Sequence, residues 1–380
     1  MIYLDAAATT KPKEEVIQAM MPYLTDMWQN PSSLYRSSVT VRNEIEKARN
    51  VIADFINAES DEIVFTSGGS ESNCTAIQGF VNKCRSNNKN PLIITSKIEH
   101  KSILLCTEAV AHYNTYTVDV DKDGFVDMNM LESILQTFPN RSVLVTIQFA
   151  NNEIGTIQHI KDISDMVHAY GGVFHTDAVQ AFGHEGIDVK ELGIDMLSAS
   201  GHKIGAPKGI GILYIKNGID ISPLIYGTQE NGRRGGTENV PYIIGLAEAV
   251  KIAEKKRLVK WFKVNRYQKL LMDQLENLGC TVNGSRESRL ANNISVTFSQ
   301  TLTGEALIYL LDTSGINISA GSACNSHSQS ASHVLKAIGL SDRDAMRTVR
   351  LTLPDDFTAD YIDKIIGEFK KAVSLLDISA

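Results

Sequence analysis

The fold of this chain is decided by one stretch, Asp195-Met-Leu-Ser-Ala-Ser-Gly-His-Lys-Ile204. It opens with apolar and small residues, as the end of a buried strand does, and then breaks at Ser200-Gly201 to present His202 and Lys203. A lysine that a strand carries into the interior, beside a glycine that permits close approach to the backbone, is a candidate Schiff-base lysine. Taken alone this pattern is weak, because most lysines at strand ends are simply solvated.

A second predicted strand ends in a carboxylate. Val173-Phe-His-Thr-Asp-Ala-Val-Gln180 is typical of a short buried strand, and Asp177 precedes Lys203 by 203 − 177 = 26 residues. That separation leaves room for one βαβ step, which would bring both strand ends to the same edge of a parallel sheet. The pair suits pyridoxal phosphate, because the lysine forms the imine and the aspartate keeps the pyridine nitrogen protonated.

Three motifs resemble those of the class V aminotransferase family: Ser200-Gly-His-Lys203, His175-Thr-Asp-Ala-Val-Gln180 and Asn151-Asn-Glu-Ile-Gly155. With Gly321-Ser-Ala-Cys324 downstream, the chain is similar to the cysteine desulfurases of the NifS/IscS type. The resemblance runs from Tyr3 to about Ile366 with the motifs in the same order.

The resemblance implies an α/β protein of fold type I of the pyridoxal-phosphate-dependent transferases. Alternating strands and helices from about residue 62 to 216 independently predict a mostly parallel sheet, which the resemblance makes seven-stranded. We expect a large cofactor-binding domain at residues 15–255. A smaller α+β domain is expected from residues 1–14 and 256–380, and it would carry the catalytic cysteine loop.

Composition narrows the function and the compartment. The net charge of −7 argues against a nucleic-acid-binding surface, and no apolar run approaches the roughly 18 residues of a membrane span. We therefore expect neither nucleic acid nor membrane among the partners. The N-terminus lacks the pattern of a signal peptide. The five cysteines include no Cys-x-x-Cys pair, so neither a disulfide framework nor a zinc site is expected, and a reducing cytoplasmic location fits best.

A glycine-rich turn between a strand and a helix predicts an anion site. Ser67-Gly-Gly-Ser-Glu-Ser-Asn73 follows the predicted strand Glu62-Ile-Val-Phe-Thr66, and free N–H groups at a helix start attract anions. The turn matches neither a dinucleotide fingerprint nor a P-loop. By resemblance it is the cradle for the cofactor phosphate, and Ser70 and Glu71 are cofactor contacts.

The resemblance assigns further residues to the cofactor. His100 would stack on the pyridine ring and relay protons, which suits an imidazole whose unperturbed pKa is about 6.5. The alternative for His100 is a loop residue that caps the helix from Lys101. Thr237 would reach the phosphate in the partner subunit, which implies a homodimer, although its polar segment could equally be a solvated loop. The remaining cofactor contacts implied are Asn152, Asp177, Gln180, Ser200, His202 and Lys203.

Cys324 is the candidate nucleophile. It lies in a serine-rich polar stretch that is typical of a mobile loop, whereas Cys74, Cys84, Cys106 and Cys280 have helical or apolar surroundings and are expected to be structural. Only a thiolate is nucleophilic, and a mobile loop would let the sulfur travel.

Arg350 lies on a predicted strand, and its planar guanidinium suits a substrate carboxylate. Asn152 is expected to help bind the substrate. Two positions depart from the family pattern: Tyr35 stands where histidine is common, and Pro354 stands where glycine is usual.

The resulting hypothesis is a cysteine desulfurase that converts L-cysteine to L-alanine and leaves the sulfur on Cys324 as a persulfide. Lys203, Cys324 and His100 would be catalytic. The sulfur would pass to an acceptor protein, either an iron–sulfur scaffold or a protein of tRNA or cofactor thiolation. The alternatives are a selenocysteine lyase or β-eliminating lyase of the same fold, a cofactor-free thiol hydrolase using Cys324 and His327, and a non-catalytic sulfur-relay subunit.

Overall fold

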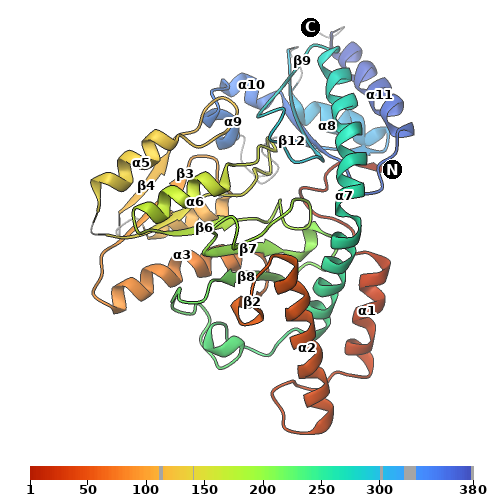
Figure 1. Ribbon diagram of the computed structural model, residues 1–380. Helices are drawn as coiled ribbons and strands as arrows, with labels where there is room; N and C mark the ends of the chain where they lie inside the picture. The colour runs from red at the N-terminus through yellow and green to blue at the C-terminus, as the bar shows by residue number, and fades with distance from the viewer. Residues whose placement is uncertain (111–113, 140, 300–302, 321–330, 378–380) are drawn as a thin grey trace.

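Strands and helices alternate along most of the chain. The computed structural model describes residues 1–110, 114–139, 141–299, 303–320 and 331–377 (Figure 1). Its strands are β1 (Ile2–Tyr3), β2 (Ile63–Thr66), β3 (Pro91–Ser96), β4 (Thr115–Val118), β5 (Ser142–Thr146), β6 (Val173–Asp177), β7 (Met196–Ser200), β8 (Gly211–Ile215), β9 (Cys280–Val282), β10 (Asn293–Phe298), β11 (Ile316–Asn317), β12 (Ser319–Ala320) and β13 (Thr348–Thr352).

The helices are α1 (Glu14–Thr25), α2 (Arg36–Phe55), α3 (Gly69–Ser86), α4 (Lys101–Ala109), α5 (Met128–Thr137), α6 (Ile160–Ala169), α7 (Val240–Glu276), α8 (Gly304–Thr313), α9 (His333–Ala337), α10 (Asp342–Met346) and α11 (Asp360–Asp377). Short 3₁₀ turns lie at Ser60–Glu62, Gly201–Lys203 and Glu230–Gly232.

The larger sheet has seven strands in the order β2-β8-β7-β6-β5-β3-β4. Strand β8 is antiparallel to both of its neighbours, and every other pairing is parallel. This confirms the predicted α/β fold with a mostly parallel sheet. Because six strands run in one direction, their carboxyl ends meet along one edge.

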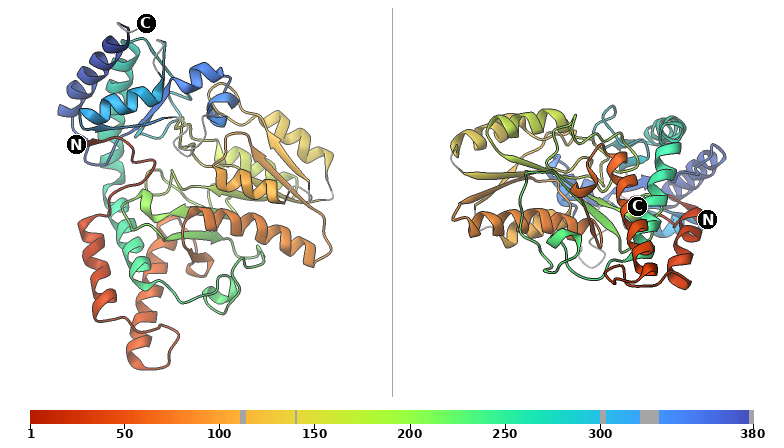
Figure 2. Two further views of the ribbon diagram at one scale, coloured as in Figure 1. Left: turned by 180° about the vertical axis from the view of Figure 1, so that it is seen from behind. Right: turned by 60° about the horizontal axis from the view of Figure 1, so that its bottom comes forward.

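Both faces of this sheet are buried, which explains its continuous apolar strands. In β3, Leu92 and Ile94 belong to one buried cluster with α2, α6 and the first half of α7, whereas Ile93 belongs to a second cluster with α3 and α4. Side chains alternate between the faces because the strand period is two. Helices α3 and α6 accordingly lie on opposite faces of the sheet (Figures 1 and 2).

A second, antiparallel sheet has the order β12-β13-β10-β9, and β1 pairs with β11 beside it. Its core includes residues from both ends of the chain, such as Leu4 and Phe369. Helix α7 joins the two regions: Val240–Ile252 pack on the larger sheet, and Val264–Leu275 pack on the smaller. The predicted domain boundary at 255/256 therefore falls inside one continuous helix, and the division itself stays a prediction.

In the described part of the chain, no helix combines the length and apolar character needed to cross a membrane.

Candidate active site

Most of the predicted cofactor-binding residues lie at or after the ends of five parallel strands. Asp177 ends β6 and Ser200 ends β7, and these strands pair in parallel with Asp177 opposite Ser198. His100 follows β3, Asn152 follows β5 and Gly68 follows β2. The topology therefore brings side chains that are far apart in the sequence to one edge of the sheet, where α/β proteins bind their ligands.

Lys203 lies on the turn that follows β7, and the N-terminal segment lies across it. The Lys203 Nζ donates hydrogen bonds to the carbonyls of Ala7, at 2.5 Å, and Ala8, at 2.9 Å. Thr10 donates to the His202 carbonyl from both its backbone N–H and its hydroxyl. The sequence analysis assigned this segment no functional role. Its run of small residues permits close packing and could have indicated that the segment lies against another part of the site.

Asp177 is buried, and two donors fix its carboxylate. Val179 N–H donates to Oδ1 at 2.9 Å, and Asn73 Nδ2 donates to Oδ2 at 2.7 Å. Gln180 Nε2 donates to the Ala7 carbonyl at 3.2 Å, so Gln180 and Lys203 share one acceptor. The carboxylate, the amide and the amine are thus held by protein groups around the same edge.

Both predicted histidines have defined hydrogen-bond partners. His100 is the N-cap of α4, and its Nδ1 accepts from Ser102 N–H at 3.1 Å, which confirms the capping alternative for that nitrogen. His202 Nδ1 lies 3.1 Å from the Thr9 hydroxyl. Burial, and then the charges of Lys203 and Lys208, lower the pKa of His202 to about 4, so its ring is neutral at physiological pH.

The glycine-rich turn packs closely against the segment after β6. Gly68 has a φ of 153°, which residues with side chains rarely adopt, and a Cβ on Gly69 would lie 2.5 Å from Val179 Cγ2. Ser70 is exposed in the first turn of α3, where backbone N–H groups have no helical acceptor. A hydroxyl and open N–H groups at the start of an 18-residue helix are the features of an anion site.

Glu71 contacts protein groups beside this turn. It accepts from Ser67 N–H at 2.8 Å and pairs with Arg234 Nε at 2.9 Å. Burial raises the pKa of Glu71, but Arg234 and Ser67 outweigh it, and the net pKa is lowered. The carboxylate is therefore charged and orients the turn, and its predicted contact with a cofactor stays a prediction.

The segment that carries Thr237 is anchored and is not a freely solvated loop. Glu230 receives two hydrogen bonds from Arg49, at 2.7 and 2.9 Å, and one from Phe65 N–H, all of them buried. Thr237 itself is exposed and borders a cavity of about 220 Å³, which Ser67 and Arg234 also line. The polar composition of this segment favoured a solvated loop, because the sequence alone did not show that Glu230 pairs with Arg49.

Arg350 is buried on β13 and holds two described groups. Its Nη2 pairs with Asp5 Oδ1 at 2.6 Å, and its Nη1 donates to the Asn152 carbonyl at 3.1 Å. In the described part of the chain its Nε has no hydrogen-bond partner. Sequence reasoning missed Asp5, which comes 345 residues earlier and enters the site only through the pairing of the N-terminal segment with β13.

Cys324 and His327 lie outside the described residues. Just beyond them, Ser332 caps α9 and donates from its hydroxyl to Glu153 Oε2 at 2.5 Å, and His333 Nε2 lies 2.9 Å from the Glu99 carbonyl. The other four cysteines are free thiols. Cys84, Cys106 and Cys280 are buried, and Cys74 is half-buried.

The residues present fit pyridoxal phosphate. A lysine amine, a buried carboxylate and a glycine turn at a helix N-terminus lie along one sheet edge, and the Asn73 Oδ1 and Arg350 Nε atoms are buried there without a described partner. A group that carries a phosphate, a ring nitrogen and a carbonyl carbon would meet complementary chemistry from this set.

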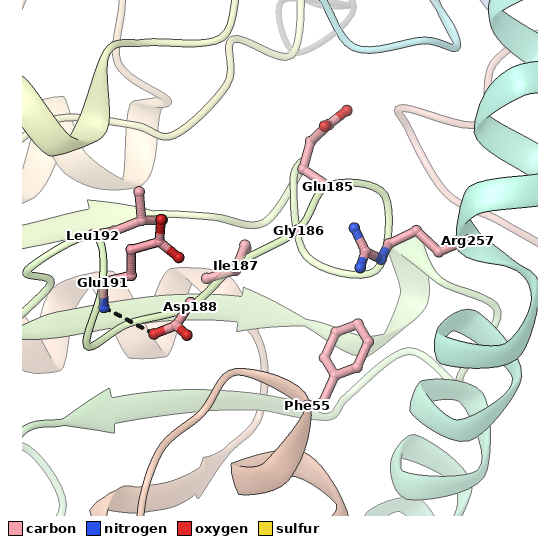
Figure 3. A pocket seen from close by; sticks show the side chains of 8 residues that line it. All are labelled: Phe55, Glu185, Gly186, Ile187, Asp188, Glu191, Leu192 and Arg257. Carbon is pink, nitrogen blue, oxygen red and sulfur yellow. Dashed lines mark hydrogen bonds between the residues drawn. The ribbon is translucent and has the colours of Figure 1, made fainter.

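A larger cavity, of about 340 Å³, lies elsewhere. Figure 3 shows its lining, which includes Phe55, Glu185, Asp188 and Arg257 and none of the predicted site residues. Asp188 is already used there, because its carboxylate accepts from the backbone of Lys190 and Glu191. Size alone therefore does not mark the functional site.

Known proteins are similar to this chain in both sequence and architecture. The class-V aminotransferase family matches residues 2–364. A cysteine desulfurase IscS of Methanosarcina thermophila is 43% identical over 99% of this chain and 92% of its own length, and one of Dictyoglomus turgidum is 42% identical over 97% and 95%. Among solved structures, a NifS-like protein gives a TM-score of 0.90 at 32% identity over 99% of both chains. The protein SspA in complex with cysteine gives 0.79 at 36% identity over 93% of this chain and 99% of its own.

The chain therefore belongs to the class-V aminotransferase family, whose members depend on pyridoxal phosphate. Within that family it belongs to the cysteine desulfurases, so it is an enzyme.

Proposed function

We propose that this enzyme converts L-cysteine to L-alanine and transfers the sulfur to Cys324 as a persulfide. The observation that carries the proposal is the parallel pairing of β6, which ends in Asp177, with β7, which leads into the turn of Lys203. His100 follows β3 at the same edge, and Arg350 reaches it from β13 by a hydrogen bond to the Asn152 carbonyl. The naming of one structural relative as a complex with cysteine supports the substrate.

The cofactor, pyridoxal phosphate, would be held by Lys203, by Asp177 at its ring nitrogen and by the turn from Ser67 to Ser70 at its phosphate. The other contacts proposed from the same chain are Glu71, His100, Asn152, Gln180, Ser200 and His202. When bound, it supplies an electron sink that makes the bonds around the substrate Cα and Cβ labile.

Each remaining role belongs to a residue of this chain. Arg350 would bind the substrate carboxylate through its planar fork, with Asn152 beside it. The Lys203 amine, once free, would take a proton from the substrate and later return one, assisted by His100. Two hydrogen bonds, from Val179 N–H and Asn73 Nδ2, hold the Asp177 carboxylate in a fixed orientation.

Sulfur transfer needs the Cys324 thiolate as nucleophile. The thiolate would attack the substrate sulfur, so that an S–S bond forms as the Cβ–S bond breaks and the electron pair of that bond stays with the carbon framework. A proton added to the carbon completes alanine, and the persulfide remains on the enzyme.

A homodimer with composite sites is part of the proposal. Helices α1 and α2 and the loop between them project from the body of the molecule (Figures 1 and 2). The loop and its surroundings expose Trp28, Leu34 and Tyr35, and Tyr226 is exposed next to the Thr237 segment. Such a concentration of exposed apolar side chains is typical of a subunit interface. Thr237 would then contact the phosphate in the partner subunit.

The persulfide would be consumed by an acceptor protein, either an iron–sulfur scaffold or a thiolation protein. We place the reaction in the cytoplasm because it needs a reduced Cys324, and the four described cysteines are free thiols as well.

The test is a product assay on the purified protein with L-cysteine and a thiol reductant. We expect equimolar alanine and sulfide from the wild type and neither from Cys324→Ala. The matched control is Cys280→Ala, which removes a buried thiol and should keep activity. Pyruvate with sulfide from both the wild type and Cys324→Ala would instead establish β-elimination, and turnover of selenocysteine alone would establish a lyase.

A further inference from the structure

A chain of hydrogen bonds connects Asp177 to His100 through two residues without an assigned role. Asn73 Nδ2, on α3, lies 2.7 Å from Asp177 Oδ2 and 2.9 Å from the Ser102 hydroxyl on α4. The Ser102 hydroxyl lies 2.7 Å from His100 Nδ1. Asn73 is only 1% exposed, so these contacts are shielded from solvent.

The direction of each bond follows from the chemistry of the groups. A carboxylate only accepts, so the Asn73 amide must turn its NH₂ toward Asp177. The opposite orientation would place the amide oxygen against a negative charge. The two amide protons then go to Asp177 Oδ2 and to the Ser102 oxygen.

The Ser102 hydroxyl therefore accepts from Asn73 and gives its own proton to His100 Nδ1. The Ser102 backbone N–H also donates to Nδ1, at 3.1 Å. Two donors at one ring nitrogen require a lone pair there, so the proton of a neutral imidazole must be on Nε2.

We propose that Asn73 and Ser102 are positioning residues that hold His100 neutral, with its proton on Nε2. The inference rests on the proposed function, in which His100 assists proton transfer, and it states which ring nitrogen carries the proton while His100 does so. His100 donates a hydrogen bond from Nε2 and does not act as the base. Lys203 is then the group that carries protons to and from the substrate.

Other charged groups face His100 and must be separated from this effect. Glu153 follows β5, His333 begins α9, and both interact electrostatically with the ring, while Lys101 is its neighbour in the chain. A negative Glu153 would favour a second proton on the ring, whereas Lys101 and His333 oppose it. A Glu153→Gln variant measured in parallel isolates that contribution.

The decisive measurement is long-range ¹H–¹⁵N NMR of the full-length protein labelled at histidine, with His100 assigned from a His100→Gln spectrum. We expect Nδ1 to be unprotonated and Nε2 protonated across neutral pH. Ser102→Ala should shift the ring toward a mixture of tautomers or toward protonation, and Ser102→Thr should restore the wild-type pattern. A wild-type ring that is protonated on Nδ1, or a Ser102→Ala spectrum identical to the wild type, would overturn the proposal.

Kinetics supply the second measurement. Ser102→Ala removes a donor that favours the neutral ring of His100. We therefore expect the acid limb of the kcat/KM profile to move to higher pH by ~0.5–1 unit, which is the size of one hydrogen bond to a titrating group. Asn73→Ala should move it in the same direction, because the Ser102 hydroxyl loses the donor that orients it. The control Ser133→Ala removes a hydroxyl that bonds only a backbone carbonyl on α5, and it should leave the profile unchanged.

The NMR result does not depend on turnover. A wild type with the expected tautomer but no alanine production would count against the proposed function and leave the hydrogen-bond chain intact. Alanine production with the wrong tautomer would do the reverse.

Discussion

At the scale of single residues, Glu99 is a buried carboxylate beside the candidate site. It is fully buried next to His100 and accepts hydrogen bonds from the Ser96 hydroxyl and from Gln148 N–H. Burial, reinforced by the charge of Asp177, raises its pKa from 4.5 to about 8 in spite of those hydrogen bonds. Between about pH 4.5 and 8, the folded protein therefore keeps a proton on Glu99 that the unfolded chain releases.

This difference predicts a pH dependence of stability. Because the folded pKa lies above the unfolded value, the free energy of unfolding should fall as pH rises from about 4.5 to about 8. Glu99→Gln mimics the protonated form, so its stability relative to wild type should increase across that window by ~4 kcal/mol. Urea unfolding at several pH values measures it. Glu108→Gln, an exposed change on α4, is the control, and parallel curves for Glu99→Gln and wild type would contradict the prediction.

Arg350 offers a second test at this scale. If it binds the substrate carboxylate through two parallel N–H groups, Arg350→Lys keeps the charge but loses the fork. We expect KM for L-cysteine to rise by ~10–100-fold with a smaller change in kcat. Arg347→Lys is the matched control, because Arg347 is also buried and donates to the Ser299 carbonyl at 3.4 Å. An unchanged KM would leave Arg350 only its structural contacts with Asp5 and the Asn152 carbonyl.

At the scale of elements, the start of α3 packs against the segment after β6 only because Gly69 has no side chain. In Gly69→Ala the new methyl would lie 2.5 Å from Val179 Cγ2 and push the two elements apart. We expect the Kd for pyridoxal phosphate to rise by ~10-fold or more, measured by titration of the cofactor-free protein.

The clash can be relieved independently. Val179→Ala combined with Gly69→Ala should recover most of the cofactor affinity, since the offending methyl is removed. Gly367→Ala on α11 is the control, because no atom of the described residues lies within 4 Å of its Cβ position and alanine favours a helix. Failure of the double variant to recover would show that the clash is not the cause.

At the scale of the whole molecule, the projecting loop between α1 and α2 should form the subunit interface. Leu34 is 93% exposed and Trp28 is 72% exposed. Leu34→Asp should convert a dimer to monomers in analytical ultracentrifugation and reduce activity, because in the proposed dimer each site would take Thr237 from its partner. The control Leu105→Asp, at a site 61% exposed on α4, should leave the dimer intact. A wild-type monomer with full activity would refute the dimer.

The sequence by itself determined the architecture and the family. Continuous apolar strands alternate with amphipathic helices, and this pattern has few solutions other than a covered, mostly parallel sheet. It also predicted that the strand ending in Asp177 and the strand before Lys203 finish at one edge of a parallel sheet, and β6 and β7 do pair in parallel. These inferences succeeded because they depend on periodicity and short separations, which a sequence displays directly.

Only the tertiary structure decided the partners of those residues. Asp5 reaches Arg350, Arg49 anchors Glu230, and Asn73 joins Asp177 to Ser102, over separations of 29 to 345 residues. No local pattern encodes such contacts, because they arise where elements distant in sequence pack together and buried polar groups must find a donor or acceptor there. The hydrogen-bond partners in the site therefore follow only from the packing of the whole molecule. The sheet edge on which they lie can be predicted from the order of strands and helices in the sequence.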